Sequence, residues 1–273
     1  MTDAIAQSAN ARNNAQWQDL RLTRWAAVRD AVWERIDPLL HPGSRVAIVG
    51  AGSCDDIPLV RIAARAEHVD LVDFDTTSTE RAIARLDDTA RSRIRILEED
   101  VTGGCADTVL RAARGDSAMP NALPLPVAAI GTGDYDLIVG DMLYSQLLHP
   151  GLIALQLTSG EQRAVMRRYD SPLTTALVQR LQASVHGLGH ALHIHDVACW
   201  SATHPQPVEL ADVLEDPTST WPQLARHDNC DPHLALERIG APVLATDWWE
   251  WPFEPKKRFV VRATLAGAGA RTA

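Results

Sequence analysis

The residues with the clearest chemical meaning lie in a glycine turn near the start of the chain. The segment Val46–Leu59 reads VAIVGAGSCDDIPL, so a short apolar run ends at Gly50-Ala51-Gly52, with Ser53 directly after it. Gly50 can form a tight turn, and Gly52 lets the backbone approach a ligand because it has no Cβ. A strand that ends in such a turn and opens a helix is typical of a doubly wound nucleotide-binding sheet. We expect Gly50, Ala51, Gly52 and Ser53 to border a ligand.

Two carboxylates, Asp55 and Asp56, follow the turn, where a dinucleotide-binding motif needs a small residue. Carboxylates at a helix N-terminus suit the helix dipole, but they repel a diphosphate in the same place. This pair disfavours NAD and FAD and favours a nucleoside that carries no phosphate.

A further acid ends the second apolar run, VDLVDF, at Val69–Phe74. Asp73 lies about 20 residues after Gly52, a spacing at which a carboxylate can accept hydrogen bonds from both ribose hydroxyls. The alternative is that Asp73 and Asp75 only cap the next helix. Strand, glycine turn and spaced acid together favour a ribose site made by Asp73 and Phe74.

The motif DMLYSQLLHP follows the apolar run Tyr135–Asp141, at the strand end where open α/β sheets bind ligands. Asp141 is a candidate to orient or deprotonate an acceptor, and Tyr144 and Gln146 are candidates to line its pocket. The alternative is that Asp141 caps a helix and Tyr144 packs on the sheet.

Two histidines, His193 and His195, stand two positions apart on a predicted strand and so share a face, a spacing compatible with a metal site. No matching third ligand is evident, and we expect no metal. His195 and its neighbour Asp196 remain candidates for a general base near the ligand edge.

The chain has eight tryptophans against three tyrosines and three phenylalanines. Most tryptophans in folded proteins pack in the core. The alternative is that Trp25, in the first helix, and Trp248 and Trp249, in a predicted DWWEWPFEP loop, close over a flat aromatic acceptor.

Apolar runs alternate with helical segments along most of the chain, which predicts an α/β fold with a doubly wound, mostly parallel sheet and helices on both faces. We predict strands at 45–50, 69–74, 94–97, 135–141, 190–199, 243–245 and 258–265, and helices at 15–36, 57–66, 79–86, 108–113 and 173–185. Residues 1–43 are a predicted N-terminal helical extension that caps the acceptor site, with the part up to about Arg12 unstructured. Residues 44–265 form the predicted α/β domain, with an insertion around 202–232, and 266–273 a flexible tail.

From Arg45 to about Tyr144, the glycine turn and the spaced acids resemble the class I S-adenosylmethionine-dependent methyltransferases. The resemblance implies a seven-stranded Rossmann-like sheet whose last strand is antiparallel. It also implies that the glycine turn wraps the methionine part of the cofactor and that Asp73 holds the ribose. Asp100 would contact the adenine amine, with Val101 beside the ring, and Asp141 and Met142 would lie near the sulfonium.

Two positions depart from the family pattern. Ile48 stands where an acid is common, two residues before the first glycine, and Cys54 replaces the usual third glycine. Asp55, Asp56 or Asp141 could supply the missing charge for the amino group of the cofactor.

Composition narrows the classes of partner. Asp and Glu outnumber Lys and Arg by 35 to 26, giving a net charge of −9, which disfavours nucleic-acid binding. No apolar run is long enough for a membrane span, the N-terminus lacks a secretory pattern, and the four cysteines form no CxxC pair. We expect a cytoplasmic protein with no membrane partner, and a homo-oligomer is left open.

The resulting functional prediction is an enzyme that transfers a methyl group from S-adenosylmethionine to a small molecule by in-line displacement. S-adenosylhomocysteine is the other product, and an aromatic or heteroaromatic acceptor is the favoured class. The alternatives are an NAD-dependent oxidoreductase and a non-catalytic ligand-binding or regulatory domain with the same sheet.

Overall fold

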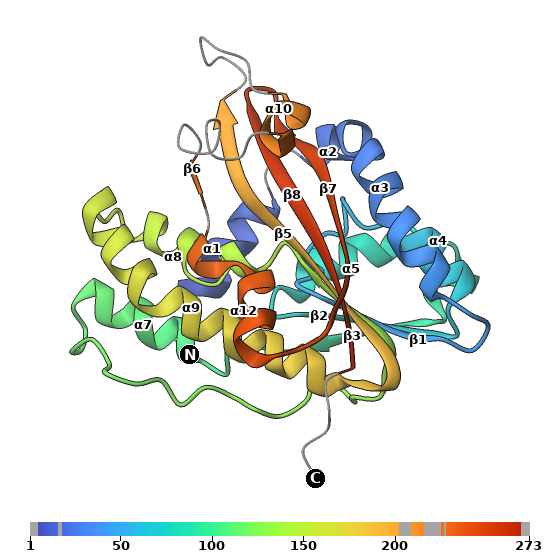
Figure 1. The fold of residues 1–273 in the computed structure, drawn as a ribbon, viewed down its shortest axis with the longest axis horizontal. Helices are drawn as coiled ribbons and strands as arrows, with labels where there is room; N and C mark the ends of the chain where they lie inside the picture. Colours follow the sequence, from blue (N-terminus) through green and yellow to red (C-terminus); the bar gives the residue numbers. More distant parts are fainter. Residues whose placement is uncertain (1–4, 16–17, 202–208, 216–224, 227, 269–273) are drawn as a thin grey trace.

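A twisted sheet runs through the middle of the protein in the computed structural model, which describes residues 5–15, 18–201, 209–215, 225–226 and 228–268 (Figure 1). The strand order is β3-β2-β1-β4-β5-β8-β7, and the two-residue β6 pairs with β5. The strands are β1 (Arg45–Val49), β2 (His68–Asp73), β3 (Ile94–Glu98), β4 (Tyr135–Asp141), β5 (Val185–Ser201), β6 (Ala225–Arg226), β7 (Val243–Glu254) and β8 (Lys257–Gly267).

The first five strands pair in parallel, whereas β8 is antiparallel to both β5 and β7. This order, with its antiparallel end, confirms the doubly wound fold that the sequence predicts. The strand β1 lies between β2 and β4 and is covered on both faces, so its apolar residues are consecutive rather than alternating. Val46 and Ile48 join one hydrophobic cluster, and Ala47 and Val49 join the other.

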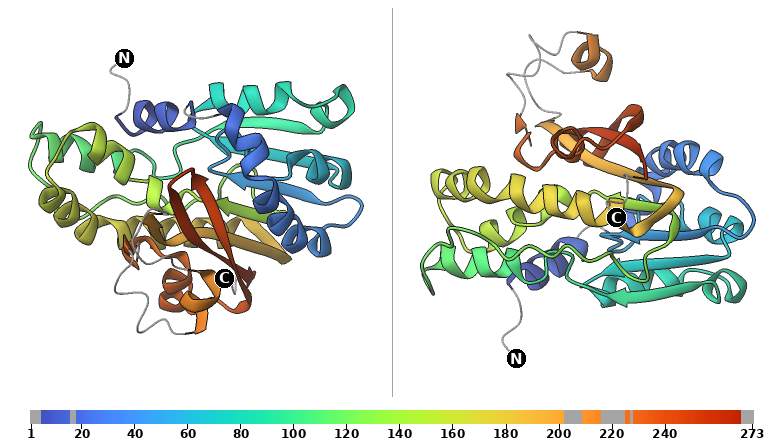
Figure 2. Two further views of the ribbon diagram at one scale, coloured as in Figure 1. Left: turned by 90° about the horizontal axis from the view of Figure 1, so that it is seen from above. Right: turned by 60° about the horizontal axis from the view of Figure 1, so that its bottom comes forward.

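Helices cover both faces of the sheet (Figure 2). The Ala47 face packs against α7 (Cys105–Arg114), α8 (His149–Ala154), α9 (Ser159–Ser184) and α12 (Pro232–Ile239). The Val46 face packs against α3 (Ala26–Ile36), α4 (Leu59–Arg65), α5 (Thr76–Ala84) and α6 (Asp88–Arg91). Short 3₁₀ turns η1 (Asp37–Leu39), η2 (Tyr144–Gln146) and η4 (Asp228–Cys230) join some of these elements. Among the described helices, none is both long and apolar enough to span a membrane.

The N-terminal segment differs from the prediction. The stretch before Arg12 is not unstructured but belongs to a helix, α1 (Ile5–Asn14), whose Ala6 and Ala9 are buried. The predicted 15–36 helix is interrupted at Trp25, which separates α2 (Gln18–Arg24) from α3. Trp25 has φ −95° and ψ 16°, outside helical values, because its ring packs against the C-terminal strands.

The C-terminal half also holds more regular structure than predicted. The helix expected at 173–185 already begins at Ser159, where Thr158 and Glu161 form a capping box. The DWWEWPFEP segment is not a loop, because β7 continues to Glu254 in pairing with β8. Much of the predicted 202–232 insertion lies outside the described residues, which there include α10 (Leu210–Glu215). Of the predicted tail, Ala266 and Gly267 belong to β8, and 269–273 lie outside the described residues.

A buried carboxylate ties three strands together at the opposite edge of the sheet from their carboxyl ends. Asp70 in β2 is fully buried and accepts two hydrogen bonds from Arg95 in β3, at 2.9 and 2.8 Å. The hydroxyl of Tyr135 in β4 donates a third at 2.6 Å, and His68 lies 2.8 Å away. Burial alone would raise the pKa of Asp70, but these hydrogen bonds outweigh it and lower the pKa below its usual value.

Replacing Asp70 by Asn should therefore lower the free energy of unfolding at pH 7 by about 1.5–3 kcal/mol, because charge-assisted bonds are lost. The stabilisation by Asp70 is present above its ordinary pKa and disappears as pH falls through the lowered folded-state pKa. Denaturant unfolding of both proteins at pH 7 and near pH 3 should show the difference shrinking in acid. An equal difference at both pH values would contradict this account.

Candidate functional site

Three adjoining cavities lie at the carboxyl ends of β1, β2 and β4. The β2–β3 cleft is lined by Ala6, Asn10, Gly50, Val72, Asp73, Phe74, Glu99, Asp100, Val101, Thr102, Ala106, Leu143, Gln146 and Leu147. The turn cleft is lined by Asn13, Asn14, Arg21, Trp25, Gly50, Ala51, Ser53, Cys54, Asp56, Asp141, Met142, Gln146, Trp251 and Phe253. A third, larger space, the outer cavity, adjoins the turn cleft and shares Met142 and Gln146 with it. The predicted cofactor residues therefore gather at one edge of the sheet. Gly52 is not among the lining residues given above, but its amide is hydrogen-bonded to Asp73, which is.

The glycine turn fits between two loops with no room to spare. Gly50 has φ +78°, and a Cβ added there would lie 2.8 Å from Leu143 Cβ and 3.0 Å from the Asp141 carbonyl oxygen. The amide of Gly52 donates to Asp73 Oδ2 at 2.8 Å. The turn after β1 is thus held both by the loop after β4 and by the acid at the end of β2.

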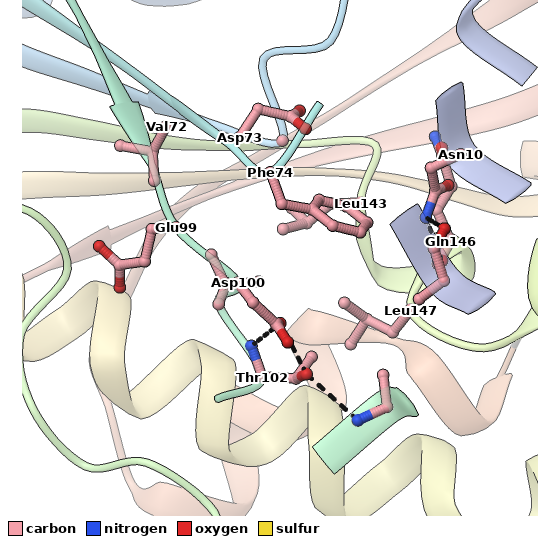
Figure 3. A pocket seen from close by; sticks show the side chains of 14 residues that line it. Asn10, Val72, Asp73, Phe74, Glu99, Asp100, Thr102, Leu143, Gln146 and Leu147 are labelled. Carbon is pink, nitrogen blue, oxygen red and sulfur yellow. Dashed lines mark hydrogen bonds between the residues drawn. The ribbon is translucent and has the colours of Figure 1, made fainter. Parts of the chain in front are cut away.

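Asp73 faces the β2–β3 cleft, whereas Asp75 is the helix cap (Figure 3). Asp73 Oδ1 accepts the amide of Asp75 at 2.8 Å, so each oxygen already holds one backbone donor. Burial raises the pKa of Asp73 to about 6, although these amide bonds oppose the shift. A carboxylate can accept about four hydrogen bonds, so Asp73 keeps acceptor capacity for a ligand.

Asp100 both fixes the loop after β3 and lines the β2–β3 cleft. Its Oδ1 accepts the amide and the hydroxyl of Thr102 at 2.8 and 2.7 Å (Figure 3). Its Oδ2 accepts the amide of Gly104 at 2.8 Å. These bonds fix the loop after β3, and Asp100 and Val101 remain part of the cleft wall. The apolar side chains of Phe74 and Leu143 lie across the cleft from Asp100 (Figure 3).

Two carboxyl groups share a hydrogen bond in the turn cleft. Burial first, and then the neighbouring charge of Asp56, raises the pKa of Asp141 well above its ordinary value. Burial also raises the pKa of Asp56, to about 6, while the hydrogen bond from Asp141 and the nearby Arg21 pull it down. In this pair Asp141 donates the shared hydrogen bond and Asp56 accepts it.

Asp55 does not join this pair. Its carboxylate accepts from Ser53 Oγ at 2.6 Å and from Arg85 at 2.7 Å, and it lies 3.8 Å from Arg21. These bonds fix the helix entry, and among the described residues Asp55 is not part of the cleft wall. Asp56 is therefore the member of the Asp55-Asp56 pair that faces the cleft.

Arg21 is a functional candidate that the sequence interpretation missed. It lines the turn cleft, its guanidinium lies 4.8 Å from the centre of the Trp25 ring, and its side chain is only 10% exposed. It donates to the carbonyls of Asn13 and Asn14, which joins α2 to the end of α1. Burial lowers the pKa of Arg21, but the guanidinium stays charged.

The backbone is strained on both sides of the turn cleft. Cys54, at the position of the missing third glycine, and Met142 after β4 both have φ +49°, a left-handed conformation that is uncommon outside glycine. Such strain often occurs at ligand sites because the surrounding contacts hold it in place.

Two of the predicted catalytic residues are placed elsewhere. Tyr144 is 1% exposed and His195 is fully buried, and in the described part of the chain neither lines these cavities. The Tyr144 hydroxyl lies 2.6 Å from Nδ1 of His193, whose pKa burial lowers to about 3, so that imidazole is neutral. Tyr144 and His195 form part of the interior beneath the cavity floor, because η2 turns Tyr144 back under Gly140.

Of the three tryptophans predicted at the acceptor site, the structure places Trp25 in a cleft wall and Trp248 and Trp249 outside the described walls. Trp25 lines the turn cleft and meets Trp251 edge-on at 4.8 Å. Trp248 instead lies under the Arg262 guanidinium at 5.1 Å, and the described cavity linings include neither it nor Trp249. Trp251 belongs to the wall instead. Alternation along β7 places Trp248 on the opposite face, whereas Trp249 shares the face of Trp251 and packs against the Val46-face cluster.

Helix α1 passes over all three cavities. Ala6 and Asn10 line the β2–β3 cleft, and Asn13 lines both the turn cleft and the outer cavity. Gln7 donates to the Phe74 carbonyl at 2.6 Å, and Asn14 donates to Asp75 Oδ2 at 3.0 Å. In the part of the chain that the structure describes, no cluster of three or more His, Cys, Asp or Glu could hold a metal ion.

Comparisons with known proteins return similarities only at the level of structure. No family model matches the chain, and no curated protein matches it in sequence. An S-adenosylmethionine-dependent methyltransferase from Leishmania major is 15% identical with a TM-score of 0.48, over 92% of this chain and 82% of that one. A TehB-like methyltransferase from Corynebacterium glutamicum is 14% identical with a TM-score of 0.44, over 96% and 100%. A proposed RNA methyltransferase from Pyrococcus horikoshii is 12% identical with a TM-score of 0.44, over 89% and 82%. All three TM-scores are low, so the function is argued from the residues of this chain.

Replacing Gly50 by Ala should disrupt the site, because the new Cβ would meet Leu143 Cβ and the Asp141 carbonyl at a positive φ. We expect a loss of about 1–3 kcal/mol of unfolding free energy. Chemical denaturation measures it, with Gly187→Ala, where a Cβ meets nothing within 4 Å, as the matched control. Equal stability of the two variants would show that the turn is not constrained as described.

Proposed function

We propose that this protein is an S-adenosylmethionine-dependent methyltransferase that acts on a small molecule. The observation that carries the proposal is the series of three adjoining cavities at one edge of the sheet, to which we assign adenosine, the amino acid part of the cofactor and the acceptor. The glycine turn, with Gly50 and Ala51 in the wall and Gly52 bonded to Asp73, lies where the first two meet.

We assign the adenosine half to the β2–β3 cleft by the chemistry of its walls. Asp73 is placed to accept the two ribose hydroxyls, and Phe74, Val101 and Leu143 offer apolar surface to a flat purine. The remaining acceptor capacity of Asp100 suits the adenine amine. These roles remain predictions that ligand binding must test.

The charged half fits the turn cleft. The acidic Asp56–Asp141 pair suits an ammonium group, and Arg21 is suited to a carboxylate. The same pair opposes a diphosphate, because a second anion beside buried carboxylates would be destabilised. NAD-dependent oxidation is therefore disfavoured by this chain's own residues.

When bound, S-adenosylmethionine supplies an electrophilic methyl group on a positively charged sulfur, which is transferred in line to a nucleophilic atom of the acceptor. The residues here position the two partners: Met142 and Gln146 line both the turn cleft and the outer cavity, so they lie where the two spaces meet. Gln146 is held there by donating from Nε2 to the Met142 carbonyl at 2.9 Å.

A small acceptor is favoured by the outer cavity, which has a volume of about 790 Å³ and walls from α1, α8, β5, β7 and β8. Ligand pockets for small molecules have volumes of this order. The net charge of −9 further disfavours an acceptor with a polyanionic backbone.

Adenosine binding tests Asp73 without the methionine part. Asp73→Ala should weaken adenosine binding by about 1–3 kcal/mol, since charge-assisted bonds to the ribose are lost. The affinity of the wild type for adenosine should fall as pH drops below about 6. The pKa of Asp73 is raised to about 6, so its carboxylate becomes protonated there and loses its charge. Calorimetry from pH 5 to 8 measures both, with Asp88→Ala, at a 98% exposed side chain, as the control. A variant with wild-type affinity and fold would exclude the ribose role.

Paired ligands test the charged half. S-adenosylhomocysteine carries the amino acid group, and 5′-methylthioadenosine lacks it. Either single Asn variant of the pair leaves one carboxylate, so the double variant Asp56→Asn/Asp141→Asn is required. It should bind S-adenosylhomocysteine about 10- to 100-fold more weakly and 5′-methylthioadenosine as well as the wild type does. An equal loss for both ligands would place the pair outside the amino acid site.

Transfer of a labelled methyl group from S-adenosylmethionine to a metabolite extract separates an enzyme from a binding domain. Tight binding with no labelled product would favour the non-catalytic alternative. Calorimetric binding of NAD in preference to S-adenosylhomocysteine would favour the oxidoreductase.

A further inference from the structure

The outer cavity contains a buried carboxylate that the proposed cofactor site does not use. Asp196 lies near the middle of β5, and its side chain, which lines the cavity, is 7% exposed. Ser145, also in the wall, donates from Oγ to Asp196 Oδ1 at 2.8 Å. The Nδ1 atom of His195 lies 3.4 Å from the same oxygen.

A second feature of the same cavity is an aromatic wall. Trp251 and Phe253 in β7 and Phe259 in β8 line it, with ring centres 4.9 to 5.8 Å apart. Nζ of Lys257 lies 4.8 Å from the centre of the Phe259 ring and 5.7 Å from that of Phe253, which shows that this surface accommodates a cation. Flat apolar surface on one side therefore meets a buried acid on the other.

A β-bulge places Asp196 and Cys199 on the same face of β5. The register of β5 against β8 shifts between Asp196 and Ala198, so Asp196 and Cys199 both point into the cavity although they are three residues apart. Trp251 and Phe253 also line the turn cleft, and thus the cavity opens directly on the site proposed for the cofactor.

We propose that Asp196, oriented by Ser145, is the hydrogen-bond acceptor that positions a protic N–H or O–H group of an aromatic acceptor against the Trp251–Phe253–Phe259 wall. This rests on the proposed function for its role in methyl transfer, but the binding itself does not. A buried acid is costly to desolvate, and a donor on the ligand lowers that cost, whereas an apolar ligand of the same shape does not. An ionised carboxylate can accept about four hydrogen bonds, so one carboxylate can hold the Ser145 hydroxyl and a ligand donor together.

Three probes of one shape test the proposal: 2-naphthylmethylamine, 2-naphthylmethanol and 2-methylnaphthalene. Their binding to wild-type protein and to Asp196→Asn is measured by calorimetry or ligand-detected NMR, with and without saturating S-adenosylhomocysteine. We expect Asp196→Asn to weaken the amine, the alcohol or both by about 5-fold or more and the hydrocarbon by less than about 2-fold. Ser145→Ala should cause a smaller loss of the same selectivity, and Asp196→Glu should retain part of it.

The hydrocarbon serves as the control for the fold, because a merely structural role of Asp196 would weaken all three probes alike. Asp88→Asn controls for the loss of a surface charge, since Asp88 begins α6 and its side chain is 98% exposed. Loss for the amine alone identifies a cationic group, and loss for the alcohol as well identifies a neutral donor.

An unchanged ratio between donor and hydrocarbon probes in Asp196→Asn would overturn the proposal, and so would the failure of all three probes to bind the wild type. If S-adenosylhomocysteine does not bind, the proposed function fails, yet the probe ratios without it still decide the role of Asp196.

Discussion

The bond from the Gly52 amide to the Asp73 carboxylate is the constraint on which the site depends. It joins the turn after β1 to the end of β2, and the Gly50 backbone packs against Leu143 and the Asp141 carbonyl after β4. Three strand ends are thereby fixed relative to one another, and the β2–β3 cleft and the turn cleft lie on either side of this contact. The arrangement is costly, since Asp73 is buried and its pKa is raised, which is typical of functional positions.

Much of this edge could be predicted from sequence because its signals are local. Short apolar runs that end in glycine or aspartate mark buried parallel strands, and β4 was predicted with its observed bounds, Tyr135–Asp141. The glycine turn and an acid at a fixed spacing predicted Gly50, Gly52 and Asp73 as residues of a ligand site. The antiparallel last strand followed from the family resemblance and is confirmed by the pairing of β8.

The rest depended on contacts between distant segments. The buried stripe of α1 consists of Ala6, Ala9 and Asn10, whose helical spacing carries almost no hydrophobic signal. Arg21 resembles any surface arginine until α2 is placed beside the turn cleft. Tyr144 and His195 were placed at the correct edge but on the wrong side of it, because only the fold determines which face of a loop or strand is covered. The β-bulge that turns Cys199 toward Asp196 leaves no trace in the sequence.

The way in which helix α1 is held bears on how ligands enter and leave the cavities that it covers. Its contacts are two small buried side chains and a few hydrogen bonds, such as those of Gln7 and Asn14, rather than a large apolar face. A segment held this way can detach locally without unfolding the sheet. Ligand entry into all three cavities, and ligand release from them, would then depend on the undocking of the ten residues of α1.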